Sequence, residues 1–133
     1  KARESPFPRG RPPLYRYRPE KHDLVRVVEG DQRKDFVQAA IGQGWIENAP
    51  VVFVVTGSAE RQRPKIADRN AEFLAVEPGL AAQGLFLQAT ALGLGGTFVG
   101  GFKPDAARAF LKLPATEDVF AVLPVGARKS ATP

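Results

Sequence analysis

The sequence contains no cysteine and no methionine, and it has one histidine in 133 residues. Without cysteine, disulfide bonds and thiolate chemistry are excluded, and the single histidine leaves too few ligands for a zinc site. No apolar run reaches the roughly 20 residues that a membrane-spanning helix needs. The opening KARESPFPRGRPP also lacks the apolar core of a signal peptide. We therefore expect a cytoplasmic protein without a membrane segment.

Methionine is missing at position 1 as well, so we expect the sequence to be processed or truncated. An apolar fraction of 44% with 25% charged residues is ordinary for a soluble globular domain. The formal charge of +5 is concentrated in residues 1–34, which hold ten Lys and Arg against five Asp and Glu. We interpret residues 1–13 as an irregular basic arm that is solvated or contacts a partner chain. Nucleic-acid binding is the weaker alternative because no nucleic-acid motif accompanies the arm.

The hydrophobic pattern predicts a single domain of mixed α and β structure. Alternation at Leu14–Arg18 and at 24–28, around turn residues at 19–22, predicts a β-hairpin that Gly30 ends. The other predicted elements are a helix capped by Asp31 and running to Ile41, a short helical turn at QGWIENAP, a strand at 51–56 covered on both faces, a helix at 71–94, a short strand at 97–99, a helix at 104–112 and a last strand at 119–125. We therefore expect an α+β fold in which helices cover a sheet with strands of both directions.

The helix expected at 71–94 is apolar or small on nearly every side from Leu80 onward. A helix that is apolar all round is buried all round, and a chain of this size can hardly enclose it. We therefore expect this helix to be buried at the interface of a homodimer. Pro78 should begin or kink the helix because it lacks an N–H, and Gly93 and Gly95 should end it.

Residues 92–102 read LGLGGTFVGGF and contain five glycines. The dinucleotide motif G-x-G-x-x-G fails because Phe98 stands at the third glycine, and the P-loop motif fails because Phe102 stands where lysine must be. Two interpretations remain open. In one, the glycines only end a helix and form a tight turn. In the other, Gly100 and Gly101 present bare N–H groups to the edge of a flat aromatic ligand.

No cluster of carboxylates and no nucleophile–histidine arrangement is apparent, so we predict no catalytic side chain and no metal site. His22 lies in the predicted hairpin turn, where we interpret it as structural. Trp45 either lines a substrate entrance or packs in the core, and core packing is the favoured interpretation.

Four segments in this order resemble the nitroreductase-like FMN-dependent oxidoreductases: LYRYRPEKHDL, NAPVVFVVTG, LFLQATALGLGGTFVGGF and FAVLPVGA. The resemblance covers roughly residues 14–127 and is nearest to the SagB-type dehydrogenases, which oxidise azolines to azoles in modified peptides. It implies a nitroreductase-like fold with a mixed, mostly antiparallel central sheet flanked by helices. It also implies a homodimer with FMN at its interface, and hydride transfer through flavin N5 between NAD(P)H or an organic substrate and an acceptor.

The resemblance further implies which residues bind the cofactor. Phe98, Val99, Gly100 and Gly101 would lie against the isoalloxazine, with a backbone N–H near N5. Arg128, in the polar tail at 128–133, would meet the FMN phosphate. The Arg-Arg-Ser-x-Arg-like and Pro-Ser-x-Gly segments of such proteins are not in this sequence, so we expect the N-terminal part of the domain to be missing from it. A flavin-free scaffold that binds a partner or small ligand is therefore the alternative to an FMN-dependent enzyme.

Overall fold

A computed structural model describes residues 13–128 and gives only the backbone course of 63–67 within that range. Apart from residues 13 and 128, the predicted basic arm and polar tail lie outside the described residues.

The predicted hairpin is confirmed. β1 (Leu14–Arg18) pairs antiparallel with β2 (Asp23–Val28). His22 closes the turn with a left-handed φ of 50°, and its Nδ1 lies 2.7 Å from the Tyr17 hydroxyl. This contact agrees with a structural role for the histidine. Gly30 follows the hairpin with a φ of 78°, a conformation that glycine adopts without steric cost.

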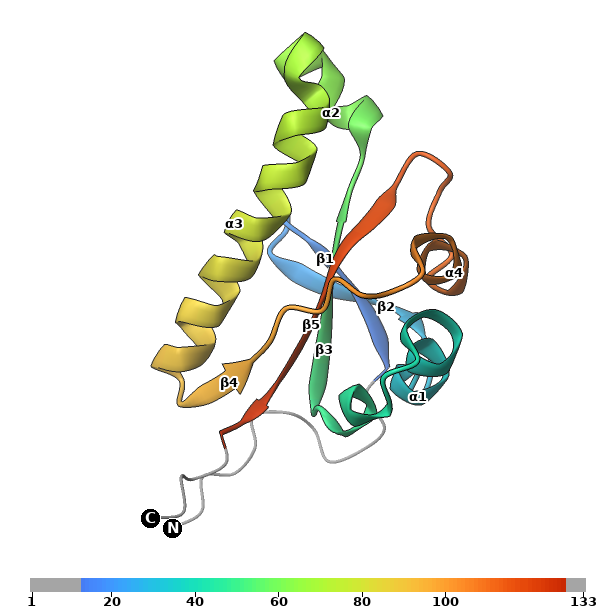
Figure 1. The fold of residues 1–133 in the computed structure, drawn as a ribbon, viewed down its shortest axis with the longest axis vertical. Coiled ribbons are helices and arrows are strands. Elements are labelled where there is room, and N and C mark those ends of the chain that lie inside the picture. The colour runs from blue at the N-terminus through green and yellow to red at the C-terminus, as the bar shows by residue number, and fades with distance from the viewer. Residues whose placement is uncertain (1–12, 129–133) are drawn as a thin grey trace.

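A separate three-stranded sheet forms the centre of the fold (Figure 1). Its order is β3 (Val51–Gly57), β5 (Asp118–Ala127), β4 (Leu94–Gly96), and both outer strands run antiparallel to β5. β5 is the buried strand of this sheet, since residues 121–125 are all buried. The predicted last strand is therefore confirmed, with one more residue at its start and two more at its end.

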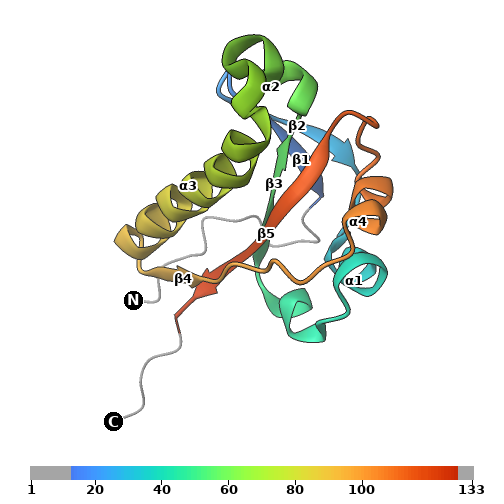
Figure 2. The ribbon, with the colours of Figure 1, turned by 45° about the horizontal axis from the view of Figure 1, so that its top comes forward.

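Helices lie on both faces of this sheet (Figures 1 and 2). The long helix α3 covers one face, and α1 and α4 cover the other. α4 begins at Pro104, which suits the first turn of a helix because its N–H would be unpaired there in any case. The helical elements are α1 (Arg33–Phe36) with a π-helical continuation (Val37–Ile41), a 3₁₀ segment (Gly44–Asn48), α2 (Ala59–Ile66) with a 3₁₀ turn (Ala67–Arg69), α3 (Asn70–Ala91) and α4 (Pro104–Phe110).

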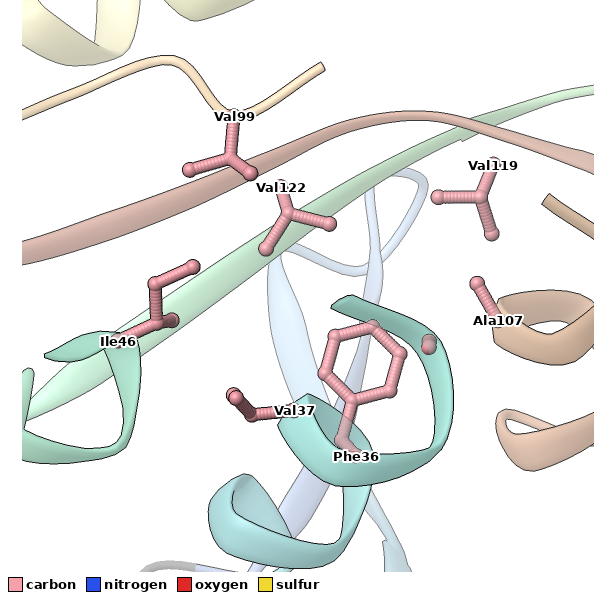
Figure 3. Close-up of a cluster of buried hydrophobic side chains, with 8 residues drawn as sticks. Phe36, Val37, Ile46, Val99, Ala107, Val119 and Val122 are labelled. Carbon is pink, nitrogen blue, oxygen red and sulfur yellow. The ribbon is translucent and has the colours of Figure 1, made fainter. Parts of the chain in front are cut away.

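β5 supplies side chains to two cores because successive residues of a strand point to opposite faces. Val122 lies in the core beneath α1 and α4 (Figure 3), whereas Ala121 and Leu123 pack against α3. The pairing with β3 shifts register so that Phe120 is an extra residue, and this bulge returns Val119 to the face of Val122. The first core consists of Phe36, Val37, Ala40, Ile46, Val99, Ala107, Val119 and Val122.

Two strand predictions were wrong in part. β3 is an edge strand whose two faces are only partly covered: Val52 and Val54 pack against the first core and Val55 against the core under α3, but Phe53 is exposed. An apolar run indicates that a strand is buried, but it does not show which elements cover the strand. The short strand lies at Leu94–Gly96 instead of 97–99, because the backbone of these residues pairs with residues 125–127 of β5. Only Val99 of the predicted strand makes a β-bridge, with Val122.

The prediction that α3 is buried all round does not hold within one chain. The helix begins at Asn70, so Pro78 lies inside it and does not begin it. The side of α3 that faces away from the sheet is exposed, and on it Leu80 and Leu87 are 67% and 63% accessible to solvent. Gly93 ends the helix as predicted, with a φ of 74°. One chain therefore covers only one side of α3.

Arg33 connects the start of α1 to the segment that enters β3. Asp31 precedes the helix, and its Oδ1 accepts the N–H of Arg33 at 3.0 Å. The Arg33 guanidinium donates to both oxygens of Asp31, at 2.9 and 2.5 Å, and to the carbonyl of Ala49. These hydrogen bonds to Asp31 raise the pKa of Arg33 above its usual value, so Arg33 keeps its positive charge at every working pH.

Replacing Arg33 by alanine should lower the free energy of unfolding by about 1–3 kcal/mol, because it removes charged hydrogen bonds from a half-buried site. Arg69→Ala is the matched control. Arg69 pairs with Glu72 at 2.7 Å on the surface, and exposed pairs contribute about 0–1 kcal/mol. Urea unfolding of both variants measures the difference. Equal losses in the two variants would show that the link to Ala49 contributes nothing.

Candidate functional site

Residues 98–101 follow β4 and cross β5 before the chain enters α4 (Figure 2). Backbone hydrogen bonds hold this segment on β5. The N–H of Val99 donates to the carbonyl of Val122 at 2.9 Å, and the N–H of Val122 donates back at 3.2 Å. The N–H of Thr97 donates to the Pro124 carbonyl at 3.3 Å. The predicted site segment is thus a fixed backbone attached to the buried strand.

Phe98 and Val99 differ in what their side chains contact. Val99 is buried in the core next to Val122 (Figure 3). Phe98 is exposed. Any role of Val99 toward a ligand would therefore belong to its backbone, while the ring of Phe98 is available at the surface.

Gly100 and Gly101 present free backbone donors. Val99 directs both its N–H and its carbonyl toward β5. In an extended chain the backbone groups of successive residues point to opposite sides, so the Gly100 N–H points away from β5. Among the hydrogen bonds of residues 13–128, none uses the N–H of Gly100 or of Gly101. The Gly100 N–H can therefore donate to an acceptor atom of a ligand, and the Gly101 N–H is a second donor that the described residues leave unused.

The glycines of residues 92–102 differ in whether the fold requires them. Gly93 has a positive φ. At Gly96 a Cβ atom would lie 2.9 Å from the Phe86 ring and 3.0 Å from the Pro124 carbonyl. At Gly100 and Gly101 a Cβ atom would have only ordinary contacts, at 3.4 Å from the Phe98 ring and 3.6 Å from a side-chain nitrogen. The packing of this chain therefore does not require glycine at positions 100 and 101.

A polar contact that the sequence analysis missed lies beside this pair. The Nε2 of Gln43 donates to the Gly101 carbonyl at 3.4 Å, and the Nε1 of Trp45 donates to the Oε1 of Gln43 at 3.2 Å. Trp45 is 53% exposed, so the interpretation that it packs in the core was wrong. Its neighbour Ile46 fills the core instead. No local pattern marks Gln43, because its partner is 58 residues away along the chain.

Arg128 does not lie beside Gly100 and Gly101. It follows the end of β5 and its Cγ is the nearest neighbour of Gly95, 3.2 Å from where a Cβ would be. Six residues separate it from Val122, which is about 20 Å along a strand at roughly 3.3 Å per residue. Residues 98–101 therefore form one continuous segment after the C-terminal end of β4, and Arg128 lies beside β4 itself, near Gly95.

The arrangement fits one edge of a flat heteroaromatic ring. Gly100 offers an N–H that points away from β5, Gly101 offers a second unused N–H, and Phe98 offers an exposed aromatic surface. Over the part of the chain that the structure describes, no group of three or more His, Cys, Asp or Glu side chains could hold a metal ion. The helices described likewise include none that is long and apolar enough to cross a membrane.

Known proteins share this fold and sequence pattern. A protein of Methanocaldococcus jannaschii named as a nitroreductase is 34% identical over 113 residues, which is 85% of this chain and 56% of that protein. The NADPH-flavin oxidoreductase of Vibrio harveyi is 32% identical over 64% of this chain and 38% of its own length. The solved structure of the V. harveyi NADPH:FMN oxidoreductase complexed with NAD⁺ matches with a TM-score of 0.65 and 25% identity, over 84% of this chain and 53% of that chain.

The chain thus spans about half the length, or less, of the curated relatives that it matches. The fold agrees with these relatives: a mixed α and β structure with antiparallel sheets and a long helix. The model of the nitroreductase family matches residues 6–127, which is nearly the whole sequence. Sequence and fold together show that the chain belongs to the nitroreductase family.

Proposed function

We propose that this chain belongs to an FMN-dependent oxidoreductase and that residues 98–101 bind one edge of the flavin ring. One observation carries the proposal. Gly100 and Gly101 are glycines that the packing of the chain does not need, and their N–H groups lack partners among residues 13–128. The flavin oxidoreductase named among the relatives supports the choice of ligand.

When bound, FMN would supply hydride transfer through its N5 atom, between NAD(P)H or an organic substrate and an acceptor. The residues of this chain would position the ring. The N–H groups of Gly100 and Gly101 would donate to its edge, and the β-bridge of Val99 would hold their backbone in place. The side chain of Gln43 would hold the Gly101 carbonyl in place by a hydrogen bond, and Trp45 would hold the side chain of Gln43. Arg128 would pair with a phosphate, a role that rests on the sequence resemblance.

The same proposal includes a homodimer that forms along α3. Val76, Leu80 and Leu87 are exposed, and at 100° per residue they lie within about 40° of one another on the helix. An exposed apolar stripe of this kind marks an interaction surface. A second copy of the chain is the partner that the resemblance implies, and it would bury the side of α3 that one chain leaves open. We place this dimer in the cytoplasm, in agreement with the absence of cysteine.

The finer assignment is to the SagB-type dehydrogenases, which would make the substrate an azoline in a modified peptide. Its support is the segment LYRYRPEKHDL, which forms the β1–β2 hairpin. Conversion of a thiazoline peptide to the thiazole, followed by mass spectrometry as a loss of two hydrogen atoms, tests this branch. Reduction of other acceptors without this conversion would place the protein elsewhere in the family.

A flavin-free scaffold that binds a partner or small ligand is the second candidate. The sequence as given contains no Arg-Arg-Ser-x-Arg-like segment that could bind the flavin phosphate, which favours this candidate. Purification of the full-length protein and its visible spectrum after addition of FMN decide between the two candidates. Retained flavin absorbance supports the enzyme, and failure to bind any flavin supports the scaffold.

The variant Gly100→Ala/Gly101→Ala tests the placement of the flavin. We expect FMN affinity to fall about tenfold or more, equivalent to about 1.4 kcal/mol, with little change in thermal stability. The added methyl groups would stand between the N–H donors and the ring edge, while the chain itself accommodates them. Titration of flavin fluorescence measures the affinity.

Gly96→Ala is the matched control for this experiment. Its methyl group would meet Phe86 and the Pro124 carbonyl, so it should lower thermal stability. Unchanged FMN affinity in the double variant, in a wild-type protein that binds flavin, would contradict the placement at residues 100 and 101.

A further inference from the structure

A cavity of about 350 Å³ lies between the β1–β2 hairpin and the end of α4. None of the residues that line it belongs to the segment 98–101 or contacts that segment through a hydrogen bond given above. It is near the lower limit of the roughly 300–1,000 Å³ that small-molecule sites occupy. The lining residues are Arg16, Arg18, Val25, Val27, Leu111 and Lys112.

The hairpin register explains which side chains face this cavity. Arg16 pairs directly with Val25, and residues opposite each other in an antiparallel pair share a face. Arg18 and Val27 follow two positions further along their strands, and the period of two keeps them on this face. This face of the hairpin therefore carries Arg16, Val25 and Val27 together with the pair Arg18 and Asp23. Leu111 adds an apolar side chain across the cavity.

The cations of the cavity differ in their partners. Arg18 donates from Nε and Nη2 to the two oxygens of Asp23, at 2.7 and 2.5 Å. These bonds raise the pKa of Arg18 and match its charge. Within the described ranges, neither a hydrogen bond nor an ion pair engages the side chains of Arg16 and Lys112. The cavity thus holds two positively charged side chains that form no ion pair within the described ranges.

Lys112 occupies a backbone position that normally favours glycine. Its φ is 53°, and its N–H donates to the Ala109 carbonyl while the N–H of Leu113 donates to the Arg108 carbonyl, both at 3.1 Å. This pair of bonds is the Schellman motif that ends many helices, with glycine as the common residue in the left-handed position. A lysine here is less favourable for the turn, which indicates that its side chain serves another purpose.

We propose that this cavity binds a small organic anion, with a carboxylate or phosphate group between Arg16 and Lys112 and an apolar body against Val25, Val27 and Leu111. The site is separate from the proposed flavin site and does not depend on it. Charge-assisted hydrogen bonds would hold the head group, and burial of the apolar body would add affinity that an inorganic ion cannot obtain.

Isothermal titration of the full-length protein with hexanoate and with phenyl phosphate tests the proposal. At least one of the two should bind with a Kd below about 1 mM, and the better ligand identifies the head group. Hexanol and inorganic phosphate should bind at least about tenfold more weakly, because each lacks one of the two features. Failure of both organic anions to bind would overturn the proposal, and so would inorganic phosphate that binds equally well.

Two variants place the ligand. Arg16→Gln and Lys112→Gly should each weaken binding about tenfold. Lys112→Gly should keep or raise the melting temperature, since glycine suits the left-handed turn, so a loss of binding in this variant cannot come from unfolding. Arg26→Gln is the control. Arg26 lies on the opposite face of the hairpin from the cavity, where it forms an ion pair with Glu29. Equal binding by wild type and the first two variants would contradict the site.

Discussion

Replacement of Leu80 and Leu87 by glutamate is expected to dissociate the proposed homodimer. Both side chains are largely exposed on α3 in one chain, and the second copy would bury them. Loss of a buried leucine costs about 1.5–3 kcal/mol, and an unpaired carboxylate in an interface adds about 3–5 kcal/mol. Since a symmetric dimer carries each substitution twice, the association constant should fall by about three orders of magnitude or more. Light scattering after size exclusion measures the change.

The isolated chain should tolerate these substitutions. Glutamate is a good helix former, and neither leucine belongs to the packed side of α3 formed by Ala82 and its neighbours. Circular dichroism of the variant should therefore show an unchanged helix content. FMN retention should fall together with the dimer, because the resemblance places the flavin at the interface.

Gln88→Glu is the control for the charge itself. Gln88 is also exposed on α3, about 100° around the helix from the stripe, so this variant should remain dimeric. A glutamate double variant with the molar mass of the wild-type dimer would show that α3 does not form the interface. A wild-type protein that is monomeric and yet retains FMN would show that no dimer is needed.

Leu123→Ala should produce the largest loss of folding stability. Leu123 is 0% exposed on the central strand β5, where it packs with Ala82, Leu85 and Phe86 of α3. Truncation of a buried leucine costs about 2–5 kcal/mol, because it removes apolar contact and leaves a cavity. The melting temperature should fall by about 10 °C in a domain of this size. Thermal and urea unfolding measure both quantities.

Leu24→Ala removes the same atoms from a surface position. Leu24 is 62% exposed on the hairpin, so its loss should cost within about 0.5 kcal/mol. Both variants are compared at one protein concentration, since dimer formation adds to apparent stability. A similar small effect at both positions would mean that the packing of β5 against α3 does not stabilise the fold.

Elements with strong local signals could be predicted from the sequence. The hairpin followed from alternating residues around a turn, α4 from Pro104 at its first position, and the end of α3 from Gly93. In each case the deciding interaction lies within a few residues along the chain, as in the positive φ of Gly93. The α+β class follows from these elements and their order, whereas the family was suggested by the resemblance of four sequence segments.

Interactions between distant residues decided the remainder. β4 lies at Leu94–Gly96 because that segment pairs with the end of β5, and no local preference of a glycine-rich strand predicts this. The apolar sequence of β3 predicted burial, but packing against the two cores covers Val54 and Val55 and leaves Phe53 exposed. Gln43 entered the site only through its contact with Gly101.

The glycine-rich segment at 92–102 shows the division most clearly. By itself, the sequence determined that this segment ends a helix, precedes another, and carries no phosphate-binding motif. Only the tertiary structure decided which of its glycines the fold requires. Gly96 is required because Phe86 and Pro124 leave no space for a Cβ. At Gly100 and Gly101 a Cβ would have only ordinary contacts, and their N–H groups have no partner among the described residues. A sequence states that a side chain is absent, but the reason depends on neighbours that only folding brings into contact.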